Sequence, residues 1–133
     1  MSRLVLSYAV ATLTVLTGCE MTLPGAPSDL VTGIVVYEHA NYLGQSAHIT
    51  KDVRDLKDID RGPCETEDGS DWNDCISSVR VAPGAVATLY RDPNFRGESL
   101  EVSSDIPNLQ LAKGSCSHDG LNDCVTSIRI GRP

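Results

Sequence analysis

The sequence has few aromatic residues and no long hydrophobic run beyond its N-terminus. Phe, Trp and Tyr make up 5% of the 133 residues, so it has no row of aromatic platforms for stacking nucleic-acid bases. Lys and Arg number 11 against 18 Asp and Glu, and they do not cluster, which argues against a nucleic-acid-binding protein. Beyond the N-terminus, no apolar run is long enough to cross a bilayer. The length of the chain favours one globular domain. Eleven Gly and seven Pro favour short strands joined by turns.

Residues 1–18 have the pattern of an export signal. Arg3 precedes a mostly apolar stretch over 4–16, which has the length of a signal-peptide core. The following Leu16-Thr17-Gly18-Cys19 resembles the bacterial lipoprotein box, which implies cleavage before Cys19 and acylation of that residue. The alternative is a plain secretory signal with a chance cysteine. Because Glu20 replaces the Asp that favours inner-membrane retention, we expect a lipoprotein of the outer membrane, facing the periplasm or the surface.

Residues 19–32 are predicted to be the lipidated N-terminus and a linker, because they contain Pro24, Gly25 and Pro27 and no periodic pattern. Residues 33–133 are predicted to form one domain, since a pattern within them is repeated. YEHANYLGQS at 37–46 aligns with YRDPNFRGES at 90–99, and WNDCISSVRV at 72–81 aligns with LNDCVTSIRI at 121–130. Each unit (33–82 and 85–131) is too small to bury a core alone, so the two units must pack together.

Apolar and polar residues alternate within each unit, which predicts strands. In the first unit we expect strands over 34–37, 46–50 and 76–81, and in the second unit over 86–90, 98–102 and 125–130. A third strand is needed in each unit, near 53–59 and 106–111, where Asp and Lys dilute the pattern. Four strands in each of two units are enough for a two-sheet antiparallel sandwich.

The order of these motifs resembles the βγ-crystallin family over residues 33–131. An aromatic residue, four residues, a second aromatic residue, one residue and a Gly occur twice, at Tyr37, Tyr42 and Gly44 and at Tyr90, Phe95 and Gly97. The resemblance implies an all-β, two-sheet antiparallel Greek key sandwich. In that fold the second aromatic residue packs over a hairpin, and a Ser from the last strand, here Ser78 or Ser127, caps it. Gly44 and Gly97 suit a left-handed backbone.

The second repeated block resembles the calcium motif of the same family, which has two Asn or Asp residues, two variable positions, a Ser or Thr, and a Ser. The resemblance implies two Ca²⁺ sites, each also borrowing the residue that follows the first aromatic residue of the other unit. The implied ligands are Asp74, Cys75 and Ser77 with Arg91, and Asp123, Cys124 and Thr126 with Glu38, where the cysteines offer backbone carbonyls. The positive charge of Arg91 should make its site weaker. Alternatively, Asn and Asp only cap backbone amides in a turn.

Cysteines other than Cys19 number four, which allows three disulfide pairings. Cys64 and Cys116 hold equivalent places in the two units, so the repeat favours Cys64–Cys75 and Cys116–Cys124. Each bridge would close the loop that leads into a calcium motif and stabilise the domain by about 2–3 kcal/mol. The alternative is four free thiols in a chain that is not exported.

No pattern of a catalytic or zinc site is present. The sequence has no Cys-x-x-Cys or His-x-x-x-His pair and no nucleophile elbow, so we expect a protein that is not an enzyme. The acidic stretch 65–74 is interpreted as a solvated loop. The leading hypothesis is a calcium-binding structural or interaction module with an unidentified protein or surface partner. The alternative is an extracellular metalloprotease inhibitor on the same fold, which would bind through a loop near Lys113 to Gly120.

Overall fold

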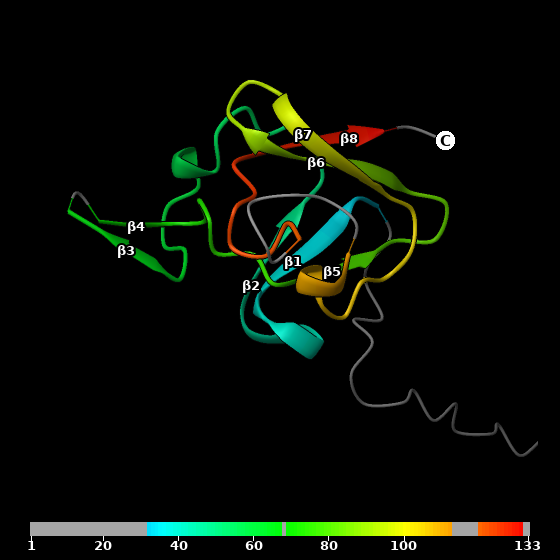
Figure 1. Ribbon diagram of the computed structural model, residues 1–133, viewed down its shortest axis with the longest axis horizontal. Coiled ribbons are helices and arrows are strands. Elements are labelled where there is room, and N and C mark those ends of the chain that lie inside the picture. Colours follow the sequence, from blue (N-terminus) through cyan, green and yellow to red (C-terminus); the bar gives the residue numbers. More distant parts are fainter. Residues whose placement is uncertain (1–31, 68, 113–119, 132–133) are drawn as a thin grey trace, which may run out of the picture.

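The protein is an all-β sandwich of two three-stranded antiparallel sheets. The computed structural model describes residues 32–67, 69–112 and 120–131. The first sheet contains β1 (Ile34–His39), β2 (Leu43–Ile49) and β5 (Ser78–Val81), in the order β2-β1-β5. The second contains β6 (Val86–Asp92), β7 (Arg96–Val102) and β8 (Ser127–Gly131), in the order β7-β6-β8. The sheets face each other (Figure 1), which confirms the antiparallel sandwich fold predicted from the repeats.

The connection after the second strand of each unit crosses to the sheet of the other unit. Val53 of the first unit forms an isolated bridge with Ile128 in β8, and Ile106 of the second unit forms one with Val79 in β5. The third strands predicted near 53–59 and 106–111 are therefore wrong, because each is reduced to one bridge. A 3₁₀ turn follows in each unit, η2 (Leu56–Asp58) and η3 (Leu109–Leu111). Asp55 and Asn108 cap these turns by accepting backbone N–H hydrogen bonds, which competes with strand formation.

One hydrophobic core lies between the sheets and draws on both units. Equivalent positions of the repeat contribute to it in pairs, such as Val36 with Leu89 and Ile76 with Val125. Burying apolar surface is the main favourable term in folding, and neither unit owns a separate core. The prediction that the two units must pack on each other is confirmed. The fully or almost fully buried members are Ile34, Val36, Ile49, Leu56, Trp72, Ile76, Val79, Ala87, Leu89, Val102, Leu109, Leu121, Val125 and Ile128.

The first repeated block forms a folded corner at the end of β1 and of β6. Tyr37 and Tyr42 meet edge to face at 5.7 Å between ring centroids, and Tyr90 and Phe95 do the same at 5.9 Å. The buried Ser78 hydroxyl donates to the His39 carbonyl at 2.6 Å and accepts from Tyr42 N at 3.0 Å.

Ser127 repeats both contacts, with the Asp92 carbonyl at 2.6 Å and Phe95 N at 3.0 Å. Gly44 and Gly97 have φ values of 78° and 77°, in the left-handed region that favours glycine. The capping and glycine roles predicted for these corners are confirmed. The sequence did not indicate that Tyr42 and Phe95 are themselves left-handed, with φ values of 63° and 60°.

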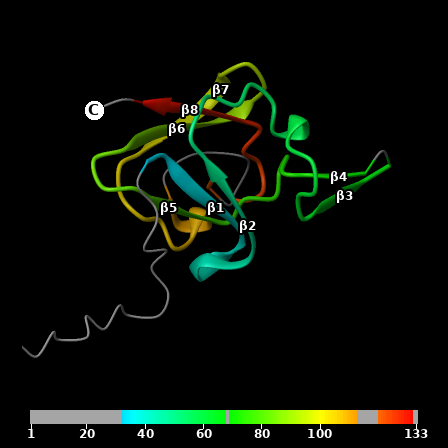
Figure 2. The same cartoon turned by 180° about the vertical axis from the view of Figure 1, so that it is seen from behind.

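A short hairpin projects sideways from the sandwich between η2 and β5. Its strands are β3 (Cys64–Thr66) and β4 (Gly69–Asp71), and both views show it standing away from the two sheets (Figures 1 and 2). A disulfide joins Cys64 to Cys75, with 5.9 Å between their Cα atoms, a usual spacing for such a bridge. This pairing was predicted. The solvated loop expected over 65–74 is confirmed in the exposure of 65–67 and is wrong in its structure, because 64–66 and 69–71 form strands and Asp71 is buried.

Several sequence predictions concern residues outside the described part of the chain. These are the signal peptide over 1–18, Cys19 and most of the linker, Cys116, and the loop near 113–120 except its last residue. Cys124 is disulfide-bonded, and its predicted partner is Cys116. Within residues 32–67, 69–112 and 120–131, no helix has the length and apolar content to span a membrane.

Candidate metal centre

The two Asn-Asp loops of the second repeated block lie side by side where the units meet. Asp74 N donates to the Val125 carbonyl, and Asp123 N donates to the Ile76 carbonyl, both at 3.2 Å. The two aspartates share a left-handed backbone, with φ values of 56° and 52°, which a short polar side chain tolerates better than most others. This arrangement brings both predicted carboxylates to one seam, related by the symmetry of the repeat.

Each carboxylate at this seam is paired with the hydroxyl of the other loop. Ser77 Oγ donates to Asp123 Oδ1 at 3.2 Å, and Thr126 Oγ1 donates to Asp74 Oδ1 at 3.4 Å. Ser77 and Thr126 are buried, whereas the two aspartates are exposed. The sequence grouped each Asp with the hydroxyl three residues later, whereas the hydrogen bonds pair each Asp with the hydroxyl of the other loop. Asp74 and Ser77 nevertheless line the same hollow.

The opening strands sit differently from the expected arrangement as well. Ser77 N donates to the Tyr37 carbonyl, and Thr126 N donates to the Tyr90 carbonyl, both at 2.9 Å. Each hydroxyl residue thus lies beside the opening strand of its own unit, where the sequence predicted the opening strand of the other unit. Only the aspartate crosses over. Asp123 and Glu38 of the first unit line the same hollow.

Glu38, Ser77 and Asp123 line one open hollow of about 400 Å³. Cys75 and the disulfide partner Cys64 belong to the same wall. The Glu38 carboxylate is held in place, because its Oε2 accepts a hydrogen bond from Gln45 N at 3.0 Å. The side chain of Glu38 is 28% exposed. Asp74 also lines this hollow, which therefore has three carboxylates and a hydroxyl among its lining residues. We call this group of Glu38, Cys75, Ser77 and Asp123 the first site.

The equivalent group of the second unit consists of Arg91, Cys124 and Thr126 with Asp74, and we call it the second site. Burial raises the pKa of the Asp74 carboxyl, and hydrogen bonds from Thr126 and Asn73 oppose that rise. Its neighbour Asn73 has a buried Oδ1 with no hydrogen-bond partner among the described residues. The Asp74 carboxylate is thus partly desolvated, and the Asn73 side-chain oxygen lacks a hydrogen-bond partner among the described residues.

Arg91 is less of an obstacle to a cation than its charge alone suggests. Its guanidinium Nε lies 3.1 Å from Asp92 Oδ1 in an exposed ion pair, and this hydrogen bond lowers the pKa of the Asp92 carboxyl. Tyr90, whose carbonyl accepts from Thr126, directly precedes Arg91. The backbone of Arg91 is therefore next to this site, while its side chain is engaged elsewhere.

The donor set fits a hard divalent cation. Ca²⁺ takes oxygen ligands from carboxylates, hydroxyls, backbone carbonyls and water, and the first site offers the first two kinds from three side chains within one hollow. Among the described residues, no group of three or more His, Cys, Asp and Glu side chains is placed to hold a metal by itself, so any ion here would also need hydroxyl, backbone or water oxygens. The candidate oxygen donors for a cation are therefore carboxylates, hydroxyls and backbone carbonyls.

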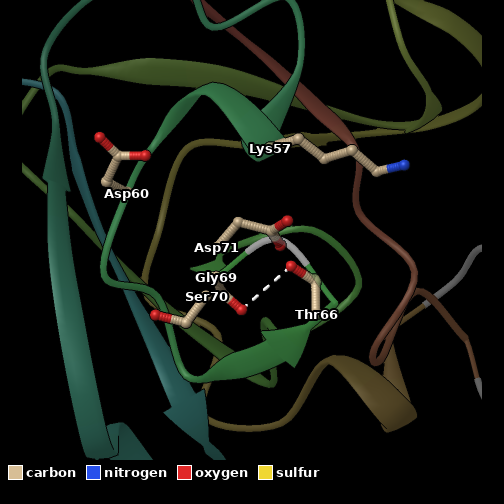
Figure 3. Close-up of a pocket in the computed structure, with 6 residues that line it drawn as sticks. All are labelled: Lys57, Asp60, Thr66, Gly69, Ser70 and Asp71. Atoms are coloured by element: carbon tan, nitrogen blue, oxygen red, sulfur yellow. Dashed lines mark hydrogen bonds between the residues drawn. The ribbon is translucent and has the colours of Figure 1, made fainter.

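A second hollow, of about 290 Å³, lies beneath the β3–β4 hairpin and includes Lys57, Asp60 and Asp71 (Figure 3). The Thr66 hydroxyl there donates to the Gly69 carbonyl at 3.0 Å. Asp71 Oδ1 accepts from Asn73 N at 2.9 Å, and the Lys57 chain extends away from both carboxylates (Figure 3). These contacts hold the turn and the base of the hairpin, so we assign this hollow a structural role.

Comparison with known proteins indicates the family of this chain. Residues 36–103, just over half of the chain, match the family described as peptidase inhibitor family I36. Spherulin-3A of Physarum polycephalum is 31% identical over 99 residues, which cover 73% of this chain and 80% of that protein.

Two solved structures show the same likeness at the level of the fold. A βγ-crystallin domain from Flavobacterium johnsoniae is 33% identical with a TM-score of 0.55, covering 74% of this chain and 93% of that one. A βγ-crystallin domain from Clostridium beijerinckii is 26% identical with a TM-score of 0.54, covering 74% and 97%. Since those chains are covered almost completely, a single domain of this kind folds as a separate chain, and residues 32–133 are a suitable unit for experiments.

Proposed function

Since the chain belongs to the peptidase inhibitor family I36 and has the βγ-crystallin fold, we propose that it is a calcium-binding module whose role is binding rather than catalysis. The convergence of Glu38, Ser77 and Asp123 in one hollow supports the proposal most directly. Glu38 and Asp123 would supply charged oxygen, and Ser77 a hydroxyl. Cys75 lines the same wall, and its backbone carbonyl is the fourth proposed donor.

In this proposal each ion would link the two units of the domain. The first site takes Glu38 and Ser77 from one unit and Asp123 from the other, and the second site takes Arg91 and Thr126 with Asp74. A ligand that binds only the folded state stabilises it by mass action. Calcium would therefore favour the assembled sandwich over the separated units, and would rigidify the seam between the two loops.

Calcium titration tests this function. For residues 32–133 we expect heat of binding, and at calcium about a hundredfold above the dissociation constant each filled site adds about 2.7 kcal/mol. For a domain of this size that corresponds to a melting temperature about 10 °C higher or more. Calorimetry and thermal melts, repeated with magnesium as the control, give the measurement, because Mg²⁺ demands a smaller and more regular site. No heat and an unchanged melt at millimolar calcium would exclude the proposal.

We further propose that a lipid on Cys19 tethers this module to the bacterial outer membrane. The support is the sequence Leu16-Thr17-Gly18-Cys19 behind an apolar stretch, followed by a Pro- and Gly-containing linker. Stable anchoring by lipid needs more than one acyl chain. The tether would hold the acidic domain beside the membrane without any spanning segment.

Peptidase inhibition is the second candidate function, and the shape of the molecule favours it specifically. The β3–β4 hairpin stands away from the sandwich (Figure 2), lies within the residues matched by the inhibitor family, and is anchored by Cys64–Cys75. A projecting segment held rigid in this way loses little entropy on binding.

An inhibition assay separates the two candidates. If the hairpin docks to a peptidase, stoichiometric domain should block a secreted metalloprotease, and the Cys64→Ala/Cys75→Ala variant should inhibit it more weakly because its hairpin is freed. The unmodified domain at about tenfold excess over a Kd in the micromolar range is expected to leave about a tenth of the activity. Full activity under those conditions, across metalloproteases of different specificity, would leave calcium binding as the function.

A further inference from the structure

The outer strands of the two sheets are equivalent in position but differ in charge. β2 is the outer strand of the order β2-β1-β5, and β7 is the outer strand of β7-β6-β8, so each has one neighbour among the described strands. The opposite edges are partly covered, because β5 and β8 carry the bridges to Ile106 and Val53. β2 and β7 also have the same sequence of exposed and buried positions.

The backbone of β2 presents hydrogen-bonding groups at this edge that no strand of the described residues pairs with. The Tyr37 carbonyl accepts from Ser77 N on the β5 side of β1, so the backbone groups of Tyr37 point away from β2. Ser46 is the partner of Tyr37 in the β1–β2 register. In an antiparallel ladder, such a residue turns its own N–H and C=O outward, and the residue two positions along does the same. Ser46 and His48 therefore offer donors and acceptors to a further strand.

Charge protects one of these edges and not the other. β7 contains Arg96, Glu98 and Glu101, whereas the seven residues of β2 include no Asp, Glu, Lys or Arg. Natural sheets commonly block an open edge with charged side chains, since an open edge is a template for pairing with another chain. β2 also begins with Leu43, which is 61% exposed. A strand edge without charged residues, next to an exposed apolar side chain, lacks the features that usually prevent pairing with another chain.

We propose that two copies of this chain associate through antiparallel pairing of their β2 edges. The chain has a formal charge of −7, so two copies repel each other over most of their surface. β2 is the edge at which they meet without bringing like charges together, whereas a two-fold pairing of β7 would place its glutamates near each other. The register that uses the whole strand centres the two-fold axis on Ser46, which is the middle residue of 43–49. Such an isologous contact closes as a dimer.

The contact is small, so the dimer is a weak one. A single pair of seven-residue strands buries much less than the roughly 1,200 Å² of a standard stable interface. Association is expected at high protein concentration, or where a shared membrane raises the local concentration of the copies. The dimer does not require calcium, since none of the first-site or second-site residues lies within β2.

Sedimentation velocity of residues 32–133, from about 10 μM to about 1 mM, tests the proposal over the range in which so small a contact forms. The unmodified domain should shift from monomer to dimer across that range. Ser46→Lys places two positive charges opposite each other and should weaken association at least about tenfold, so that monomer predominates over this concentration range. Ser99→Lys, the equivalent position on β7, is the matched control and should still dimerise.

Mixing two oppositely charged variants provides the decisive experiment. An equimolar mixture of Ser46→Lys and Ser46→Asp should restore the dimer, because opposite charges then face each other across the axis. Thermal melts of each variant confirm that it is folded, which is expected since Ser46 is exposed. Monomer at every concentration overturns the proposal. So does a dimer that Ser46→Lys does not affect, or one that Ser99→Lys weakens equally.

Discussion

Replacing Asp123 by Ala is expected to weaken calcium binding at the first site at least about tenfold, a loss of about 1.4 kcal/mol or more. The carboxylate of Asp123 crosses the seam to reach Ser77 at 3.2 Å, and it shares a hollow with Glu38. Removing it deletes one of two charged ligands and the link between the units. The calcium-dependent rise in melting temperature should shrink with it, because stabilisation follows the affinity for the folded state. Calorimetry and thermal melts of the variant measure both effects.

Double variants distinguish the exchanged pairing from pairing within a loop. Groups that ligate the same ion are energetically coupled, whereas distant groups act independently. Ser77→Ala combined with Asp123→Ala should therefore cost less than the sum of the single changes. Ser77→Ala combined with Asp74→Ala should come closer to additivity, because the Asp74 carboxylate is hydrogen-bonded to Thr126 although it borders the same hollow. The opposite result, coupling of Ser77 with Asp74 alone, would contradict the assignment of sites made from the hydrogen bonds.

The exchange of hydrogen-bond partners follows from the placement of the two loops. Asp74 N donates to the Val125 carbonyl, and Asp123 N donates to the Ile76 carbonyl. Each aspartate therefore lies beside the residue that precedes the hydroxyl residue of the other loop. The repeat indicated two equivalent loops, whereas their contact across the seam depends on the tertiary fold.

The repeat predicted the sandwich and the shared core, because two units that are each too small to bury a core must pack together. The aromatic corners, whose Ser78 cap lies 36 residues from Tyr42, were predicted from the resemblance. Ser78 and the Tyr37–Tyr42 pair belong to motifs that specify their own local geometry, and the repeat doubles the signal. The connections after β2 and β7 were predicted less well. Their segments hold Asp55 and Asn108, whose side chains cap 3₁₀ turns, and only the tertiary fold decides that one residue of each segment pairs with a distant strand.

The β3–β4 hairpin was missed for a different reason. Its acidic composition favours solvation and hides the pattern of a strand, since β-propensity is low for Asp, Glu and Gly. The sequence nevertheless holds one local signal, the Asp68-Gly69 dipeptide, which is typical of a tight hairpin turn. The disulfide closes the base of this segment and so stabilises strands that have few apolar contacts. Composition outweighed the turn signal in the sequence-based interpretation.

Removing the Cys64–Cys75 disulfide, as Cys64→Ala/Cys75→Ala, is expected to lower the free energy of unfolding by about 3 kcal/mol, the chain-entropy value for a loop of this length. The separation of 11 residues makes the loss modest in that account, but both cysteines also line the first site. Releasing them frees the hairpin and the Cys75 carbonyl together. Calcium affinity should therefore fall more at the first site than at the second, where the Asp74 carboxylate is also held by Thr126. Urea unfolding with and without calcium measures the two losses separately.

The second site is a partial internal control for this variant. Thr126 N donates to the Tyr90 carbonyl, in the other unit from the disulfide, whereas Asp74 precedes Cys75 and its carbonyl lies 3.8 Å from Cys64 Sγ. If loss of the bridge only destabilises the whole domain, both sites should weaken in parallel as the folded fraction falls. Selective loss at the first site would instead show that the bridge positions its ligands. Unchanged stability and affinity would mean that backbone packing alone holds the hairpin and the site, contrary to the role assigned to the disulfide.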